Sequence, residues 1–60
     1  PKWNIFKADI DNLGGFDAAA ARSGISVKTI KAWYQKNRTP HWISIAGIAV
    51  ALGYSPERYQ

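Results

Sequence analysis

The fold is decided by the segment Phe16–Arg38, which has the sequence FDAAAARSGISVKTIKAWYQKNR. Phe16–Ser23 contains four consecutive alanines, which favour helix and add little side-chain bulk. Gly24 can adopt the left-handed conformation that ends many helices. Ser26 is a suitable N-cap, because its hydroxyl can accept a hydrogen bond from a free amide one turn later. The segment therefore predicts two short helices joined by a tight turn, the second running from Val27 to about Lys36.

The segments on both sides of this pair predict two further helices that can cover it. Trp3–Leu13 has apolar residues at spacings of three and four, which places them on one face of a helix. Thr39-Pro40 provides an N-cap and a proline at the first helical position, and predicts a helix that continues to Leu52. The apolar residues of that helix form one stripe: Trp42, Ile45, Ile48, Ala49 and Leu52. Ser55-Pro56 repeats the cap-and-proline pattern and predicts a final turn through Tyr59.

The whole chain, residues 1–60, is expected to be one domain, because 60 residues rarely support more than one core. No alternating strand pattern occurs, so the predicted fold is all-α, a small bundle of four helices plus a short C-terminal helical turn. The chain has no cysteine, which excludes a disulfide framework. No apolar run approaches the roughly 18 residues that cross a bilayer, and the first residues lack the layout of a signal peptide. We therefore expect a cytoplasmic protein without a membrane partner.

Positive charge gathers on the outward face of the helix predicted over Val27–Lys36, in a chain of net charge +4. Three apolar residues of this helix are expected to face inward: Ile30, Trp33 and Tyr34. Three residues fall about 140–200° away from Ile30 at 100° per residue: Lys28, Ala32 and Gln35. Lys31 lies near the border between the two faces. A polar, basic face suits a polyanionic partner, although it can also be an ordinary solvated helix face.

The turn Gly24-Ile25-Ser26, preceded by alanines and followed by Ile30 and Trp33, resembles the helix-turn-helix of phage Cro proteins and lambdoid repressors, which are Xre-type DNA-binding domains. In that family a small residue, here Ala20, stands where the two helices cross. The resemblance continues downstream over three short motifs: Arg38-Thr39-Pro40, Ile48–Gly53 and Ser55-Pro56-Glu57. It covers about residues 16–57 and implies a lambda-repressor-like DNA-binding fold.

The chain departs from the family pattern at a few positions. The family often has Leu where Ser23 stands, and usually has Glu and Gly where Tyr34 and Lys36 stand. Its first helix usually begins with a polar residue that donates to phosphate, whereas this chain has Phe16-Asp17. Because the Asp17 carboxylate would repel a nearby phosphate, the usual phosphate contact is not expected there.

The resemblance implies a sequence-specific transcriptional regulator of double-stranded DNA, a Cro-like repressor, in a bacterial cell or phage-infected host. The helix Val27–Lys36 would enter the major groove, where base edges present distinguishable donors and acceptors. Base readout is assigned to the N-cap and the outward side of this helix: Ser26, Val27, Lys28, Thr29, Lys31, Ala32 and Gln35. Phosphate contacts are assigned to the residues at its end and beyond: Lys36, Asn37, Arg38 and His41. Lys28 suits the guanine acceptors O6 and N7, while a core position also stays open for Val27.

An enzyme is not expected, because the four acidic residues offer no close pair on one helix face. With no cysteine and a single histidine, His41, neither a metal site nor a cofactor is expected. Two other functions stay open for the same fold. One is an accessory factor in DNA recombination, and the other is an antitoxin-like protein-interaction module in which the lysines have no role.

A second apolar stripe is predicted on the fourth helix, opposite the stripe that faces the core. It consists of Ile43, Gly47 and Val50, with Ala46 and Ala51 beside them and Tyr54 just beyond the helix. Monomers seldom expose such contiguous apolar surface. We therefore predict a homodimer, at least on DNA, with two recognition helices about 34 Å apart on a near-palindromic operator. Alternatively, a C-terminal extension or the first helix covers the stripe.

Overall fold

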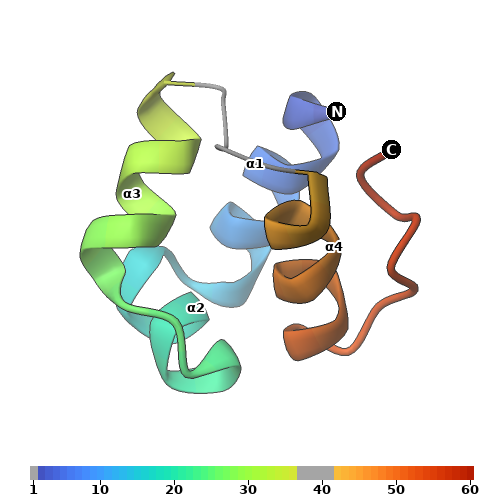
Figure 1. Cartoon of the computed structure of the whole chain (residues 1–60). Coiled ribbons are helices and arrows are strands. Elements are labelled where there is room, and N and C mark those ends of the chain that lie inside the picture. Colours follow the sequence, from blue (N-terminus) through green and yellow to red (C-terminus); the bar gives the residue numbers. More distant parts are fainter. Residues whose placement is uncertain (1, 37–41) are drawn as a thin grey trace.

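The computed structural model describes residues 2–36 and 42–60. Across these ranges the chain forms four helices and no strand (Figure 1): α1 (Trp3–Leu13), α2 (Phe16–Ser23), α3 (Val27–Lys36) and α4 (Trp42–Ala51). The all-α prediction is confirmed, as are the predicted bounds of the first three helices. α4 ends at Ala51, slightly before the predicted Leu52. Its predicted start at Thr39-Pro40 lies outside the described residues, as does the side chain of Trp42.

Two glycines allow the sharp exits that bring the first three helices together. Gly14 follows α1 with a φ of 108°, and its N–H donates to the Asp11 carbonyl at 3.1 Å. Gly24 follows α2 with a φ of 75°, and its N–H donates to the Ala20 carbonyl at 2.8 Å. Residues with a Cβ are strained at such positive φ values. The sequence signal for both helix ends therefore has a direct conformational cause.

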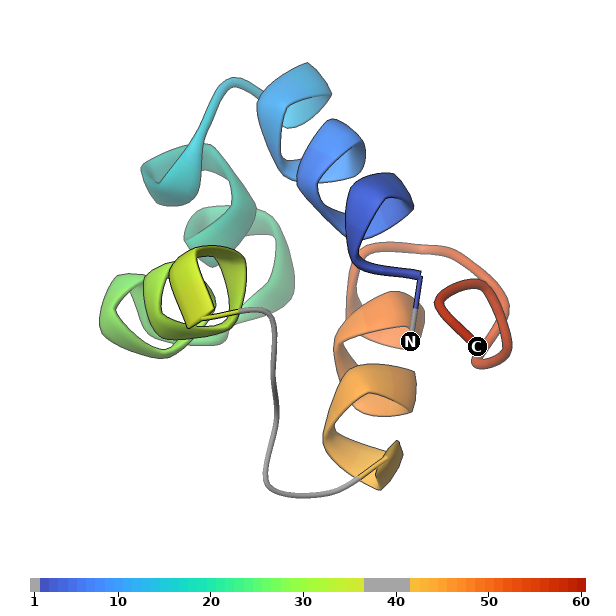
Figure 2. The same ribbon diagram turned by 90° about the horizontal axis from the view of Figure 1, so that it is seen from above.

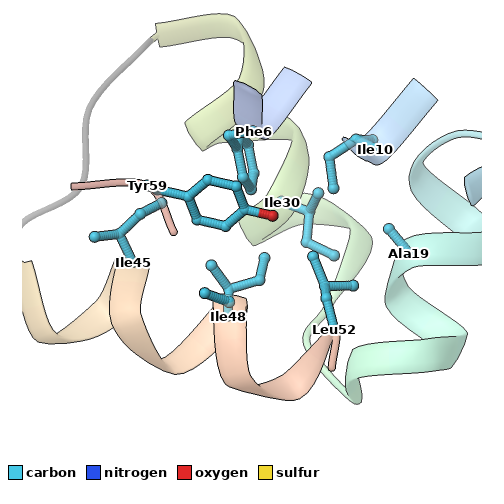
Figure 3. Packing of buried hydrophobic residues seen from close by; sticks show 9 residues of the cluster. Phe6, Ile10, Ala19, Ile30, Ile45, Ile48, Leu52 and Tyr59 are labelled. Atoms are coloured by element: carbon cyan, nitrogen blue, oxygen red, sulfur yellow. The ribbon is translucent and has the colours of Figure 1, made fainter. Parts of the chain in front are cut away.

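The core is shared by all four helices and the C-terminal turn (Figure 3). Its fully or almost fully buried residues are Phe6, Ile10, Ala19, Ile30, Ile45, Ile48, Ala49, Leu52 and Tyr59. Burial of a large apolar side chain contributes about 1.5–3 kcal/mol relative to leaving it in water. The predicted inward faces of α1, α3 and α4 are confirmed at their central residues. Tyr59 belongs to none of those predicted faces, yet it is completely buried.

Residues 55–60 form the expected C-terminal turn. The Glu57 N–H donates to Ser55 Oγ at 3.2 Å, and the Arg58 N–H donates to the Ser55 carbonyl at 3.1 Å. The Gln60 N–H then donates to the Glu57 carbonyl at 3.0 Å. Hydrogen bonds between residues three apart are those of a tight 3-10 turn. The turn carries the chain back towards the start of α1.

The two edges of the bundle differ in what covers them. The C-terminal turn lies beyond α4 (Figure 1) and curls beside the beginning of α1 when seen from above (Figure 2). There the Lys2 N–H donates to the Tyr59 carbonyl at 2.5 Å. The opposite edge is formed by α3, whose outer face is covered by no other described helix. Arg22 of α2 closes the end of α4, since its Nε donates to the Leu52 carbonyl at 3.2 Å.

Candidate nucleic-acid interface

The inner face of α3 is fixed to α1 and α2 by one aliphatic and two aromatic side chains. Ile30 is completely buried, and Trp33 and Tyr34 are half-buried against the core. The Tyr34 hydroxyl donates to the Asp11 carboxylate, at 3.0 Å to Oδ1 and 3.3 Å to Oδ2. This hydrogen bond to the Asp11 carboxylate raises the pKa of Tyr34 above its ordinary value. The predicted inward orientation of all three residues is confirmed.

Phe16 and Tyr34, two of the departures from the Cro-like pattern, pack against each other. Their ring centroids lie 5.0 Å apart with an interplanar angle of 87°, an edge-to-face contact. Such a pair contributes about 0.5–1.5 kcal/mol beyond its buried area. The Lys7 ammonium of α1 lies 5.6 Å from the centroid of the Tyr34 ring. These contacts join the start of α2 to the last turn of α3 and give both residues a structural role.

The connection between α2 and α3 is held by hydrogen bonds of Ser23, a third departure from the family pattern. Its hydroxyl donates to the Ala19 carbonyl at 2.7 Å and accepts from the Ile25 N–H at 3.1 Å. Ala19 is completely buried, while Ala20, the residue expected at the helix crossing, is half-buried. A serine can therefore replace leucine here because it bonds both sides of the turn.

Ser26 caps α3 as predicted. Its Oγ accepts a hydrogen bond from the Thr29 N–H at 3.2 Å, and its hydroxyl donates to Thr29 Oγ1 at 2.9 Å. Substituting such a cap by alanine typically costs about 0.5–2 kcal/mol. The cap therefore fixes the first turn of α3, the turn that the resemblance assigns to base contacts. The cap also joins the hydroxyls of Ser26 and Thr29, both assigned to base readout, by a hydrogen bond.

The residues assigned to base readout divide into exposed and half-buried groups. The exposed group is Ser26, Lys28, Lys31 and Gln35, and the half-buried group is Val27, Thr29 and Ala32. Lys31, expected near the border of the helix face, is therefore on the solvent side. Val27 is only half-buried, so it is not a fully buried core residue, and part of its side chain remains exposed. Lys36 is exposed, whereas Asn37, Arg38 and His41 lie outside the described residues.

The lysines of α3 have no carboxylate partner within residues 2–36 and 42–60. The only ion pair in those ranges joins Arg58 to Asp9, on the far side of the molecule. α3 contains three lysines and no acidic residue. Unpaired cations on one side of a rigid helix give a positive surface potential that attracts polyanions. Asp17, in the first turn of α2, is exposed and is the acidic residue of the neighbouring helix.

The second apolar stripe of α4 is exposed in part. Ile43 and Val50 have exposed fractions of 60% and 55%, and Gly47 between them is also exposed. The prediction that Ala46 flanks this stripe is wrong, because its exposed fraction is only 6% and it faces the core. Ala51 is half-buried. The exposed stripe is therefore narrower than the sequence suggested.

Tyr54, predicted beside the stripe, has contacts within the chain. It is half-buried against the core, and the Arg58 guanidinium carbon lies 4.1 Å from the centroid of its ring. This is a cation–π distance. Tyr54 can therefore contribute only its exposed edge to a partner.

A cluster around Asp9 was not anticipated from the sequence. Asp9 has an exposed fraction of 6%, and its carboxylate accepts hydrogen bonds from Arg58 and Tyr59. A signal was present, since Asp9 stands three residues after Phe6 and four before Leu13, on the apolar face of α1. A carboxylate at such a position requires buried partners.

Comparisons with protein-family models, curated proteins and solved structures give no significant match to this chain. In the part of the chain that the structure describes, no helix has the length and apolar character needed to span a membrane. The same residues contain no group of three His, Cys, Asp or Glu side chains that could hold a metal ion.

Proposed function

We propose that this protein is a sequence-specific, double-stranded DNA-binding transcriptional regulator, a Cro-like repressor with a helix-turn-helix formed by α2 and α3. The proposal is carried by one observation. The outer face of α3 presents three lysines that have no carboxylate partner among the described residues, while its inner face is anchored to two other helices. An α-helix fits the major groove of B-DNA. A rigid helix with a basic outer face therefore suits binding in that groove.

The two ends of α3 would do different work. Its first turn, organised by the Ser26 cap, would meet base edges, with Lys28 nearest to them. Lys36 at the other end, with the residues that follow it, would contact phosphates. Contacts to phosphates position the protein, whereas contacts to base edges discriminate sequence. Val27 and Ala32 carry no side-chain hydrogen-bonding group, so their partner would be a thymine methyl.

The protein would bind as a homodimer through the exposed side of α4. Ile43 and Val50 offer apolar surface there, with Gly47 between them. A glycine inside a helix costs about 1 kcal/mol relative to alanine, and an added Cβ at Gly47 would meet no atom of the described residues within 4 Å. Among the described residues the glycine is not required for close packing, and it would allow a second α4 to approach closely. A symmetric pair suits a near-palindromic operator.

The proposal is tested by selecting bound duplexes from a random pool, followed by footprinting of the enriched sequence. We expect one enriched half-site, repeated at a spacing of about one helical turn. Lys28→Ala should remove the preference at the base that Lys28 contacts, whereas Lys2→Ala should preserve the whole enriched sequence, because Lys2 is exposed beside the C-terminal turn. A pool that stays random at low salt would contradict the proposed function.

Two neighbouring functions give different outcomes. A recombination accessory factor would bind specific sites that do not overlap promoters. An antitoxin-like interaction module is favoured by the exposed Ile43 and Val50. Such a module would still bind its partner protein in the Lys28→Ala variant and would lose that binding in the Val50→Glu variant.

A further inference from the structure

Three exposed polar side chains of α3 form one line along its outer face: Lys28, Lys31 and Gln35. At 100° per residue they fall within about 60° of one another. The two lysines lead this line, and Lys28 stands in the capped first turn. A lysine ammonium offers three hydrogen-bond donors and no acceptor. The part of the helix nearest the groove floor therefore presents donors to the bases.

The neighbouring side chains add no carboxylate to this line, and the hydroxyl oxygens of Ser26 and Thr29 each already accept one hydrogen bond. Val27 and Ala32 have no side-chain hydrogen-bonding group. The Ser26 oxygen accepts from the Thr29 N–H, and the Thr29 oxygen accepts from Ser26. α3 contains no Asp or Glu. Gln35 carries both a donor and an acceptor, and it lies about one turn beyond Lys31 along the helix.

The major groove offers one base that matches a donor-only partner at two atoms. Guanine presents the acceptors N7 and O6, whereas cytosine presents an amino donor and adenine pairs an acceptor with a donor. Residues three apart rise about 4.5 Å along a helix, and base pairs on one strand are stacked about 3.4 Å apart. The ammonium groups of Lys28 and Lys31 can therefore reach neighbouring base pairs.

We propose that α3 recognises a half-site with two guanines on neighbouring base pairs, one read by Lys28 and the other by Lys31. This inference rests on the proposed function and specifies its DNA ligand. Both lysines contact N7 and O6 in the major groove. The minor-groove amino group of guanine takes no part in this recognition.

Base analogues in the selected duplex test this assignment by fluorescence anisotropy. 7-Deazaguanine removes the N7 acceptor, while inosine keeps N7 and O6 and removes only the minor-groove amino group. We expect 7-deazaguanine at either guanine to weaken binding by about 5-fold or more, within the roughly 5- to 150-fold range of such contacts. Inosine at the same positions should leave the affinity unchanged.

Protein variants then assign each guanine to its lysine. Lys28→Ala should bind equally to the guanine and 7-deazaguanine duplexes at one position, and Lys31→Ala should do so at the other. Lys36→Ala is the matched control, because it removes an exposed lysine of the same helix and should keep the full sensitivity at both positions.

The outcomes separate this inference from the function on which it rests. An enriched site without neighbouring G·C pairs overturns the inference and leaves the proposed function in place. So does a site whose affinity is insensitive to 7-deazaguanine while both lysine variants weaken binding, since the lysines then contact phosphates. A selection that enriches no sequence overturns both.

Discussion

The Arg58 guanidinium donates two hydrogen bonds to the Asp9 carboxylate, from Nε to Oδ2 at 2.6 Å and from Nη2 to Oδ1 at 2.9 Å. The Tyr59 hydroxyl donates to the same Oδ2 at 2.7 Å. The Tyr59 ring packs edge-to-face on Phe6, with centroids 5.4 Å apart and an interplanar angle of 90°. The last turn of the chain is therefore bonded to α1 and completes the core beside α4. The helices that hold α3 depend on it for their packing.

Replacing Asp9 by Asn should destabilise the fold. The amide keeps one acceptor oxygen but loses the negative charge to which Arg58 and the buried Tyr59 hydroxyl donate their hydrogen bonds. Hydrogen bonds to charged groups contribute about 1.5–3 kcal/mol, so we expect a loss of about 2 kcal/mol in the free energy of unfolding. Urea denaturation followed by circular dichroism measures it. Glu57→Gln is the control, because this exposed side chain keeps its acceptor for the Ser55 hydroxyl and should lower the midpoint much less than Asp9→Asn does.

Stability should fall in acid because of the same cluster. The hydrogen bonds from Arg58, followed by that from Tyr59, lower the pKa of Asp9, although burial opposes them. A carboxyl whose pKa is lower in the folded state stabilises the fold above its unfolded pKa of about 4 and loses this contribution below it. The urea midpoint should therefore hold from pH 7 to about pH 5 and fall below pH 4. In the Asp9→Asn variant the urea midpoint should fall less between about pH 5 and pH 3. An equal fall in both proteins would show that other groups cause the acid sensitivity.

Stability should also fall in alkali. Burial, together with the hydrogen bond to Asp9, raises the pKa of Tyr59. A phenol whose pKa is raised in the folded state stabilises the fold below its unfolded pKa of about 10, and this contribution is lost as pH rises further. The tyrosine absorbance near 295 nm should accordingly show a titration coupled to unfolding above about pH 10.

The helices of this chain were predictable because their signals are local. Gly24 and Ser26 each act within a few residues of themselves, through a positive φ and through a cap to Thr29. The Asp9–Arg58 pair joins residues 49 apart in the sequence, and no local pattern shows which cation reaches the carboxylate. Local patterns therefore fix helix bounds, while the partners of buried charges depend on tertiary packing.

For the candidate site, the sequence predicted which residues of α3 are exposed but not the contacts between helices that hold α3 in place. The outward position of Lys28 and Gln35 follows from helix periodicity alone, and both are exposed. The sequence did not predict the contact between Phe16 and Tyr34. Each residue by itself only departs from the family pattern, and its stabilising contact forms only when α2 and α3 pack together. Such paired departures from a pattern become intelligible only once the helices are packed.

Lys28 and Lys36 should contribute to DNA binding in different ways. Lys28→Ala should cost about 1–3 kcal/mol on the selected site and much less on mismatched sites, because it removes a base contact. Lys36→Ala should weaken binding to all sequences alike and reduce the slope of log K against log salt by about one. Titrations at several salt concentrations on matched and mismatched duplexes measure both effects. Equal losses for the two variants on every duplex would refute this division.

Gly47→Ala should separate the stability of the chain from that of its dimer. An added Cβ at Gly47 would meet no described atom within 4 Å. The free energy of unfolding of the monomeric variant should therefore be about 0.5–1 kcal/mol higher, because alanine favours helix over glycine. It should dimerise more weakly, because the Cβ keeps a second α4 further away. Val50→Glu should abolish the dimer and its cooperative DNA binding. Asn4→Glu adds the same charge at an exposed site of α1 and is the control. An unchanged sedimentation mass for Val50→Glu would exclude this interface.

Asp17→Asn should strengthen DNA binding. In a helix-turn-helix complex the first helix of the pair crosses the phosphate backbone. Asp17 is an exposed carboxylate in the first turn of α2, so the proposed function places its charge near that backbone. Removing one repelling charge should raise the affinity for all sequences by about 2- to 5-fold at low salt, the scale of a single exposed charge pair. The gain should fade at higher salt, as surface charges are screened. Glu57→Gln changes the net charge equally on the far side of the molecule, so it should leave the affinity almost unchanged. If both variants bind more tightly by the same factor, overall charge rather than the position of Asp17 is responsible, and the start of α2 does not face the phosphates.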